Sequence, residues 1–297
     1  MVATATRCAI AVSVEHVAAV VVSFHPTSEV KARLLRYAQF IDRVIVVDNS
    51  EPAAFAGSDF PAGNVVYLPL HSNMGVAHAL NVGTRHAARL GHRLAVLLDQ
   101  DSELDATALA RAISCAQPDH GITALRQVVR KRDCGNLSDT TANPIRDVDT
   151  TMTSGSVLNL DAFARCGEFE CKLFIDYVDY DYCLRLKNCG FRIVECEAAS
   201  LDHALGEVVA MNVLGISARF NSHQPFRLYY ITRNGLYLVA KHGWRHPSAA
   251  LGVFEVLAKE LFKSAFLETE KRRRMVFMAQ GFRDWMRSRY GRLQCRG

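Results

Sequence analysis

Two acidic residues at the end of an apolar run are the first candidates for chemistry. The run from Ala95 to Leu98 leads directly into Asp99 and Asp101, with Gln100 between them. Alternate side chains of a strand share a face, so both carboxylates can point at one site beyond the carboxyl end of a sheet, where open α/β sheets bind ligands. Two close carboxylates repel each other unless a cation or a proton lies between them. The pair therefore predicts a Mg²⁺ or Mn²⁺ site that shares substrate phosphates, and a turn with solvated acids is the alternative.

A second acidic cluster lies among tyrosines, just before an expected helix that ends near Gly190. It contains Asp176, Asp179 and Asp181. The free amides and the dipole of a helix N-terminus favour carboxylates, so one of the three is expected to be a cap. At least one of the three could be a general base. Caps and an ion pair from Asp181 to Arg185, four residues later, are the structural alternative, which accounts for Asp181 but not for Asp179.

Two arginines and a histidine later in the chain could complete such a site. Arg227 and Arg233 flank a pair of tyrosines, and the planar guanidinium group suits diphosphate oxygens, with salt bridges at the rim of the fold as the alternative. His203 follows an acid directly. It could complete a metal shell, or it could be a structural histidine.

The elements that must position these residues alternate between strand and helix. Continuous β-branched runs predict buried parallel strands, and the segments between them have helical spacing, which together indicate right-handed βαβ units. The glycines match neither the dinucleotide fingerprint nor a P-loop. The expected strands cover 17–24, 44–47, 65–68 and 94–99, and the expected helices cover 28–40 and 73–83.

The middle of the chain continues this alternation with longer connections. We expect helices over 105–117 and 161–166, and strands over 122–129, 157–158 and 191–194. The polar segment 130–149 is expected to be a loop, either a mobile lid or an ordinary excursion. The sequence thus predicts an α/β fold with a mostly parallel, Rossmann-like sheet flanked by helices.

Composition excludes several classes of protein. Hydrophobic residues make up 49% of the chain and charged residues 22%, which is typical of a globular protein. Nine cysteines without a C-x-x-C pair argue against a zinc site or a disulfide framework. The net charge of +5 is too small to indicate nucleic acid as a partner. No apolar run is long enough to span a membrane, so we expect a cytoplasmic protein.

The last residues, 241–297, are expected to form a helical extension after a catalytic domain over 1–240. An apolar stripe at helical spacing is followed by the basic cluster Lys271 to Arg274. Packing against the body of the protein is the default expectation, and contact with an anionic membrane surface or a dimer contact is the alternative. The stripe consists of Leu251, Phe254, Leu257, Ala258, Leu261, Phe262, Ala265 and Phe266.

Taken in order, these motifs resemble the family 2 inverting glycosyltransferases of the GT-A fold, a fold of nucleotide-diphospho-sugar transferases. The resemblance covers about residues 17–240. It is most specific toward bacterial rhamnosyltransferases, whose Leu-Leu-Asp-Gln-Asp-Ser signature is present at 97–102 and whose Arg-x-Tyr-Tyr-x-x-Arg-Asn segment is present at 227–234.

The resemblance implies a role for each matching residue. Asp179 would be the catalytic base, although Val178 stands where the family often has Glu, so Asp176 and Asp181 stay alternatives. The implied metal ligands are Asp101, Asp99 and His203. The implied donor-binding residues are Ser23, Asp48, Asn81, Asp99, Asp101, Arg227 and Arg233.

The function implied by the resemblance is transfer of L-rhamnose from dTDP-L-rhamnose to a saccharide acceptor, often lipid-linked, in bacterial cell-surface polysaccharide synthesis such as that of the lipopolysaccharide O-antigen. Such an enzyme would use Mg²⁺ or Mn²⁺ and would work in the cytoplasm, with a peripheral position on the inner face of the cytoplasmic membrane as the alternative. The acceptor, the linkage position and the oligomeric state, including a homo-oligomer, stay open.

Three other functions compete with this one. The first is a family 2 transferase that uses another nucleotide sugar, such as a UDP-hexose. The second is a haloacid-dehalogenase-like phosphatase, whose nucleophile loop also contains an Asp-x-Asp motif, but on the first strand of its sheet. The third is a non-catalytic scaffold that binds a nucleotide sugar, which would have no use for a base such as Asp179.

Overall fold

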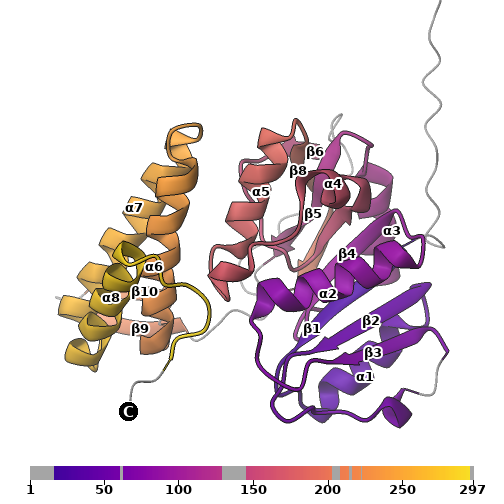
Figure 1. Cartoon of the computed structure of the whole chain (residues 1–297), viewed down its shortest axis with the longest axis horizontal. Helices are drawn as coiled ribbons and strands as arrows, with labels where there is room; N and C mark the ends of the chain where they lie inside the picture. The colour runs from indigo at the N-terminus through magenta and orange to yellow at the C-terminus, as the bar shows by residue number, and fades with distance from the viewer. Residues whose placement is uncertain are drawn as a thin grey trace, which may run out of the picture.

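The computed structural model describes residues 17–60, 63–128, 145–202, 208–213, 216–221 and 223–294. A central sheet of eight strands is flanked by helices on both faces, and three helices from the end of the chain stand beside it (Figure 1). The strand order is β3-β2-β1-β4-β7-β5-β8-β6. Because β1 to β4 are parallel neighbours, the expected Rossmann-like half is confirmed.

The parallel half brings its polar strand ends to one edge of the sheet. In the register of β1, Ser23 pairs with Asp48 of β2, and Val22 pairs with Asp99 of β4. The carboxyl ends of these three strands therefore meet where an open α/β sheet binds its ligand. The elements of this half are β1 (Val17–Ser23), α1 (Ser28–Tyr37), β2 (Arg43–Asp48), the 3-10 turn Gly57–Asp59, β3 (Val65–Pro69), α2 (Val76–Arg89) and β4 (Leu94–Asp99).

The second half of the sheet is mixed. Strand β7 is antiparallel to both β4 and β5, and β6 is antiparallel to β8. The short strand β6 falls inside the segment 130–149 that was expected to be entirely a loop, so that expectation is wrong at its end. The elements are α3 (Ala106–Cys115), β5 (His120–Val128), β6 (Ile145–Asp147), β7 (Ser156–Asn159), α4 (Leu160–Cys166), the 3-10 turn Cys171–Leu173, α5 (Val178–Asn188) and β8 (Arg192–Asp202).

The core explains why the strands read as continuous apolar runs. Side chains of β1 alternate between two apolar layers, with Ala18 and Val20 in one and Ala19 and Val21 in the other, and all four are buried. Helix α2 lies close against this sheet at Gly83, where an added Cβ would come within 2.3 Å of the Val20 side chain. Any larger residue at this position would push α2, and the loop before it, away from the sheet edge.

The end of the chain forms a separate helical layer around α6 (Pro225–His242). Helix α6 packs against α5 on one side and against α7 and α8 on the other. The predicted domain boundary at residue 240 falls inside this helix. None of the helices in the described part of the chain is long and apolar enough to cross a membrane. The other elements are β9 (Val208–Val213), β10 (Ile216–Asn221), α7 (Pro247–Phe262), the π-helical turn Lys263–Leu267 and α8 (Lys271–Met286).

Candidate active site

The loop after β4 carries the Asp-x-Asp pair and is held on both sides. The Ser154 hydroxyl accepts a hydrogen bond from the backbone amide of Asp99 at 3.3 Å and lies 2.5 Å from the Ser102 hydroxyl. The side chain of Gln100 accepts a hydrogen bond from the backbone amide of Phe24 at 2.9 Å. These contacts connect the loop to β1 and to the turn before β7, so the backbone of the loop is held at the edge of the sheet.

Asp48 lies at the end of β2 and organises the loop that follows it. Its carboxylate is fully buried and accepts hydrogen bonds from the amides of Ser50 and Ala54, at 3.0 and 2.7 Å, and from the Tyr67 hydroxyl at 2.6 Å. Burial alone would raise the pKa of Asp48, but these hydrogen bonds lower it below its ordinary value. Asp48 is therefore ionised and shapes this wall of the sheet edge.

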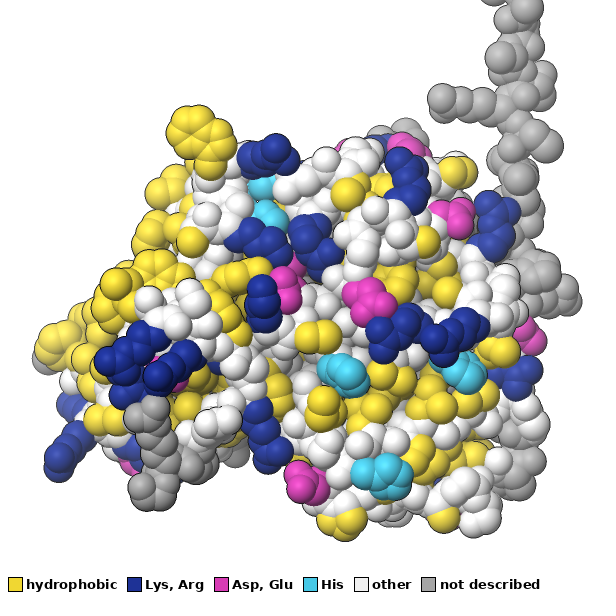
Figure 2. Space-filling view, viewed as in Figure 1, with side chains coloured by type: hydrophobic (Ala, Val, Ile, Leu, Met, Phe, Trp, Pro, Cys, Tyr) yellow, Lys and Arg dark blue, Asp and Glu magenta, His cyan; other side chains and the backbone are white. Residues whose placement is uncertain are grey.

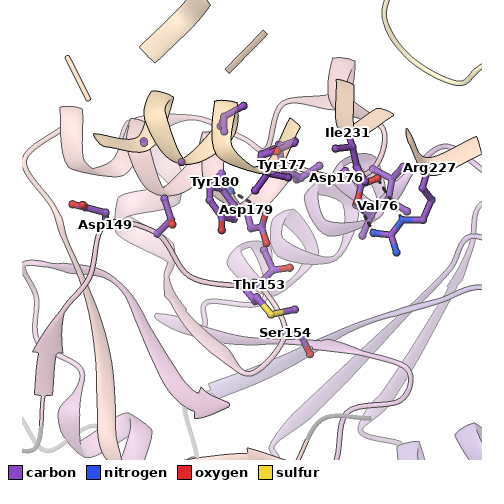
Figure 3. Close-up of a pocket in the computed structure, with 18 of the residues that line it drawn as sticks. Val76, Asp149, Thr153, Ser154, Asp176, Tyr177, Asp179, Tyr180, Arg227 and Ile231 are labelled. Carbon is purple, nitrogen blue, oxygen red and sulfur yellow. Dashed lines mark hydrogen bonds and ion pairs between the residues drawn. The ribbon is translucent and has the colours of Figure 1, made fainter. Parts of the chain in front are cut away.

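A cavity of about 960 Å³ opens beside the Asp-x-Asp loop. Asp99 lines it, as do Asp176 and Asp179 (Figure 3), so the structure brings one acid of the Asp-x-Asp pair together with two acids of the second cluster. Asp101 and Asp181 are not among the residues that line it. Its walls come from the loop before β7, from the start of α5, from α6 and from α7. They include Asp149, Thr150, Met152, Thr153, Ser154, Ile175, Asp176, Tyr177, Tyr180, His223, Arg227 and Ile231.

Asp179 has the environment of a base. It lies in the first turn of α5, between Tyr180 and the loop that carries Thr153 (Figure 3). Burial raises its pKa, the negative charges of Asp176 and Asp99 also raise it, and backbone hydrogen bonds oppose the shift, so that the pKa is about 6. A carboxylate with a pKa near the working pH is well matched to taking a proton from a hydroxyl group.

The two alternative bases are engaged in ion pairs. Asp181 is fully buried and accepts hydrogen bonds from Arg185, Lys241 and His242 at 2.9, 2.8 and 2.9 Å. The expected pair from Asp181 to Arg185 is thus confirmed. Asp176 forms an ion pair with Arg227. Asp179 is the acid of this cluster for which no ion pair is found within the described residues.

The expectation that one of these acids caps α5 is wrong. The N-cap residue is Tyr177, which makes no side-chain capping hydrogen bond and has φ 65°, in the left-handed region. Phe174 and Asp176 also have positive φ values, of 65° and 63°. An L-residue in this region costs on the order of 1–3 kcal/mol, so the surrounding structure must hold the turn in place.

Arg233 and Asn234 of α6 hold that turn. The Asn234 amide donates to the carbonyls of Leu173 and Ile175 at 2.8 and 2.7 Å, and to that of Asp176 at 3.1 Å. The Arg233 guanidinium is fully buried and donates to the carbonyls of Leu173 and Gly291, at 3.1 and 2.8 Å. The structure does not bring Arg233 to the cavity, whereas Arg227 lines it.

Two other residues implied in donor binding differ in their surroundings. Asn81 is buried in α2, where it accepts from the amide of Phe169 and donates to its carbonyl at 2.8 and 2.9 Å, so it connects two segments of the fold. Ser23 at the end of β1 is also buried, but its hydroxyl has no hydrogen-bond partner within the described residues. An unsatisfied buried hydroxyl costs about 1–3 kcal/mol, which a ligand at this sheet edge would recover.

The acidic residues fit one kind of metal site. His203 lies outside the described residues, and among those that are described no three His, Cys, Asp or Glu side chains gather around a common point. The half-buried Asp99 and the exposed Asp101 remain as a pair on one loop. Mg²⁺ and Mn²⁺ accept one or two carboxylates when water and substrate phosphates supply the other ligands.

Sequence reasoning missed several residues of the cavity. His223 lines it, and burial lowers the pKa of this histidine below its ordinary value. Helix α7 forms one wall, although the sequence predicted only packing or membrane contact for it. The α7 residues in the wall are Ser248, Ala249, Gly252, Val253 and Val256. Their small side chains at helical spacing were the available signal, since they leave room beside the helix.

A known protein is similar to this chain over most of its length. The chain is 25% identical over 269 residues to the dTDP-rhamnosyl transferase RfbF of Shigella flexneri, which covers 85% of this chain and 88% of that protein. No protein-family model matches it.

Solved structures show the fold. A crystal structure of residues 1–349 of TarS from S. aureus superimposes with a TM-score of 0.55 and 12% identity, over 91% of this chain and 80% of that one. GalNAc-T7, solved with UDP, GalNAc and Mn²⁺, gives a TM-score of 0.52 and 12% identity over 92% of this chain and 56% of that one. The GT-A fold is therefore confirmed, as is the resemblance to family 2 glycosyltransferases.

Proposed function

We propose that this enzyme, a glycosyltransferase, transfers L-rhamnose from dTDP-L-rhamnose to a hydroxyl group of a saccharide acceptor. A lipid-linked saccharide of cell-surface polysaccharide synthesis is the acceptor class we favour. One observation carries the proposal, namely that Asp179, with its pKa raised to about 6, shares a cavity with Asp99 of the Asp-x-Asp loop. The similarity to a protein named as a dTDP-rhamnosyl transferase supports this donor.

In the proposed reaction Asp179 takes the proton of the acceptor hydroxyl. The hydroxyl oxygen attacks the anomeric carbon of the sugar as the bond from that carbon to the diphosphate breaks on the opposite side. The configuration is inverted in one step, so no second carboxylate is needed as a nucleophile. Above pH 6 Asp179 is ionised and ready to accept the proton.

The sheet edge would bind the donor. We assign the nucleoside to the side of Ser23 and Asp48, and the diphosphate to the loop of Asp99 and Asp101, with Arg227 nearby at the cavity wall. Arginine at such a place stabilises the negative charge of a leaving diphosphate. Asp99 and Asp101 would hold a Mg²⁺ or Mn²⁺ ion, which when bound would act as a Lewis acid toward the same charge.

Two of the residues that the family resemblance implied in donor binding have a structural role instead. Arg233 and Asn81 are buried and bonded to backbone groups of neighbouring segments, so we assign them to holding the fold around the site. Arg233 acts on the turn before α5, and Asn81 acts on the segment before that turn.

Isothermal titration of the purified chain with dTDP-L-rhamnose, and with UDP-glucose for comparison, tests the donor. Each titration is run with Mn²⁺ and with EDTA. We expect metal-dependent binding of the dTDP sugar. Binding of the UDP sugar alone would overturn the assignment of rhamnose as the donor sugar. If neither sugar binds, the proposal that the sheet edge binds a nucleotide-sugar donor is overturned.

The variant Asp179→Asn tests the base. We expect it to bind the donor as the native chain does but to lose transfer by about a hundredfold or more, the size of effect that a general base contributes. Retained transfer would contradict the assignment of Asp179. The matched control is Asp161→Asn, an exposed carboxylate in the first turn of α4.

A further inference from the structure

The apolar stripe of α7 faces outward. The sequence favoured packing of this stripe against the body of the protein, but that expectation is wrong for most of its large members. Their side chains are about half-exposed or more exposed than that, between 46% and 69%, which is unusual for so many large apolar residues together. The exposed fractions are 69% for Leu251, 50% for Phe254, 46% for Leu261, 55% for Phe262 and 67% for Phe266.

The exposed residues share one side of their helix. Leu251, Phe254, Leu261 and Phe262 are separated by three, seven and one residues, spacings that keep them on one side of a helix with 3.6 residues per turn. Val253 lies on another side of α7 and is buried against α6. Helix α7 therefore exposes its larger apolar side chains, whereas the expectation was that they would be buried.

Helix α8 extends this apolar surface. Met275, Phe282 and Met286 follow one another at intervals of seven and four residues, and are 38%, 51% and 64% exposed. Figure 2 shows apolar side chains along the edge of the molecule that α7 and α8 form, with basic side chains next to them. We call these residues of the two helices the α7–α8 face.

The segment of the chain that carries the α7–α8 face is strongly positive. Residues 241–297 contain 13 Lys and Arg against 5 Asp and Glu, a net charge of +8, whereas the whole chain has +5. The remaining 240 residues are thus net acidic, at −3. Exposed Lys271 and Arg272 begin α8, and Arg272 precedes Met275 by one helical turn.

We propose that the α7–α8 face docks on the surface of an anionic lipid bilayer. Apolar side chains would enter the boundary between headgroups and acyl chains, while basic side chains would contact the anionic headgroups, as in helices that lie in the membrane interface. A second copy of this chain would bring two positive surfaces together, which disfavours the dimer as the occupant.

The opposite side of α7 gives this docking a consequence for catalysis. Gly252, Val253 and Val256 of α7 line the cavity that contains Asp179. Docking would therefore place the cavity within one helix diameter, about 10 Å, of the lipid surface. If the proposed function holds, the sugar of a lipid-linked acceptor would reach Asp179 while its lipid stays anchored in the bilayer.

Co-sedimentation of the full-length chain with vesicles tests the docking. Vesicles of phosphatidylcholine alone are compared with vesicles that also contain phosphatidylglycerol, at low and at high salt. We expect binding to the anionic vesicles, weakened by salt, and at least about tenfold weaker binding to neutral ones.

Two variants separate the apolar and basic contributions. Leu261→Ser with Phe262→Ser should weaken binding to anionic vesicles by about tenfold or more. Arg272→Glu should weaken it by roughly tenfold and should reduce its salt dependence. The matched control is Leu90→Ser at the end of α2, because Leu90 is 47% exposed and Leu261 is 46% exposed.

The outcomes distinguish the docking from the proposed function. Vesicle binding that the α7–α8 variants lose and the control keeps supports docking, whether or not the chain transfers rhamnose. Absence of vesicle binding overturns it, as does equal loss in the Leu90 control. A dimer in light scattering that dissociates in the Leu261 and Phe262 double variant would also overturn it, because a second copy would then occupy the face.

Discussion

The side-chain amide of Asn234 lies 3.1 Å from the carbonyl oxygen of Asp176, across the boundary between α6 and the turn that leads into α5. The same amide also contacts the carbonyls of Leu173 and Ile175. Asn234 is therefore hydrogen-bonded to the backbone of a turn that contains several left-handed residues. This turn ends at Tyr177, two positions before the proposed base Asp179. The position of the base depends on a helix that does not itself carry it.

The variant Asn234→Ala tests this dependence. Loss of the amide removes this donor from the part-buried carbonyls of Ile175 and Asp176, so we expect the free energy of unfolding to fall by about 2 kcal/mol. Turnover should fall by about tenfold at saturating donor, while the donor Kd stays within about twofold, because the sheet edge is unchanged. Asn188→Ala, in an exposed residue at the end of α5, is the control. Unchanged turnover in Asn234→Ala would contradict the positioning role.

Asp179 should reduce the stability of the fold at neutral pH. Its pKa is raised from 3.8 to about 6 in the folded chain, so ionisation costs more in the folded than in the unfolded state. Its contribution is most favourable below pH 4 and is lost as the pH rises through 6. At pH 8 the variant Asp179→Asn should therefore be more stable than the native chain, by on the order of 2 kcal/mol.

Urea unfolding at pH 8 and at pH 4 measures this difference. The two proteins should differ at pH 8 and converge at pH 4, where Asp179 is protonated in the folded native chain. Asp161→Asn serves as the exposed control in the same measurement. An Asp179→Asn variant that is less stable than the native chain at pH 8 would contradict the raised pKa.

Asp181 should behave in the opposite way. Burial alone would raise its pKa, but hydrogen bonds from His242 and Lys241 and the charge of Arg185 hold it well below its ordinary value. Its stabilising contribution is present above pH 4 and is lost as the pH falls further. We expect Asp181→Asn to cost about 3 kcal/mol at pH 7, because it leaves the partly buried Arg185 and Lys241 without their carboxylate partner.

Urea unfolding across this pH range checks the prediction, and the deficit of the variant should shrink toward pH 3. The control is Glu255→Gln, which breaks an exposed ion pair with Lys259 also spaced at four residues. That change should have no measurable effect on stability. Equal effects of the two variants at pH 7 would contradict the buried role of Asp181.

Arg227 and Arg233 should separate activity from stability. Arg227 lines the cavity with its side chain 38% exposed, so Arg227→Gln should lower transfer by about tenfold or more with little loss of stability. Arg233 is fully buried, so Arg233→Gln should lower the free energy of unfolding by about 3 kcal/mol. Thermal unfolding and a transfer assay on both variants test this, and a stable Arg233→Gln variant would contradict it.

Much of the fold could be predicted because its signals are local. The strands of the parallel half are covered on both faces, so their sequences are continuously apolar, as in Val44 to Val47. The strand β6 could not be predicted, because a polar edge strand such as Ile145–Asp147 depends on pairing with the distant β8.

The site was predicted less completely, for a geometric reason. Asp99 and Asp179 follow from their strand and helix positions, and the structure places both on one cavity. Arg227 and Arg233 were assigned the same role, but they lie six residues apart on α6. Six residues turn a helix by about 240°, so the two side chains cannot face the same cavity. The roles of Arg227 and Arg233 could be separated only once both residues were known to lie on one helix.

The position of α6 has a consequence for how this protein can change over evolution. Its first turn contacts Asp176 through Arg227, its middle holds the turn before α5, and its last residues, Lys241 and His242, bind Asp181. Helix α6 thus connects the turn before α5 to α7 and α8, the helices that bear the α7–α8 face. Substitutions on the outer surfaces of α7 and α8 would leave these contacts of α6 in place. Loss of the helical layer would remove them, and with them the support of the turn before α5.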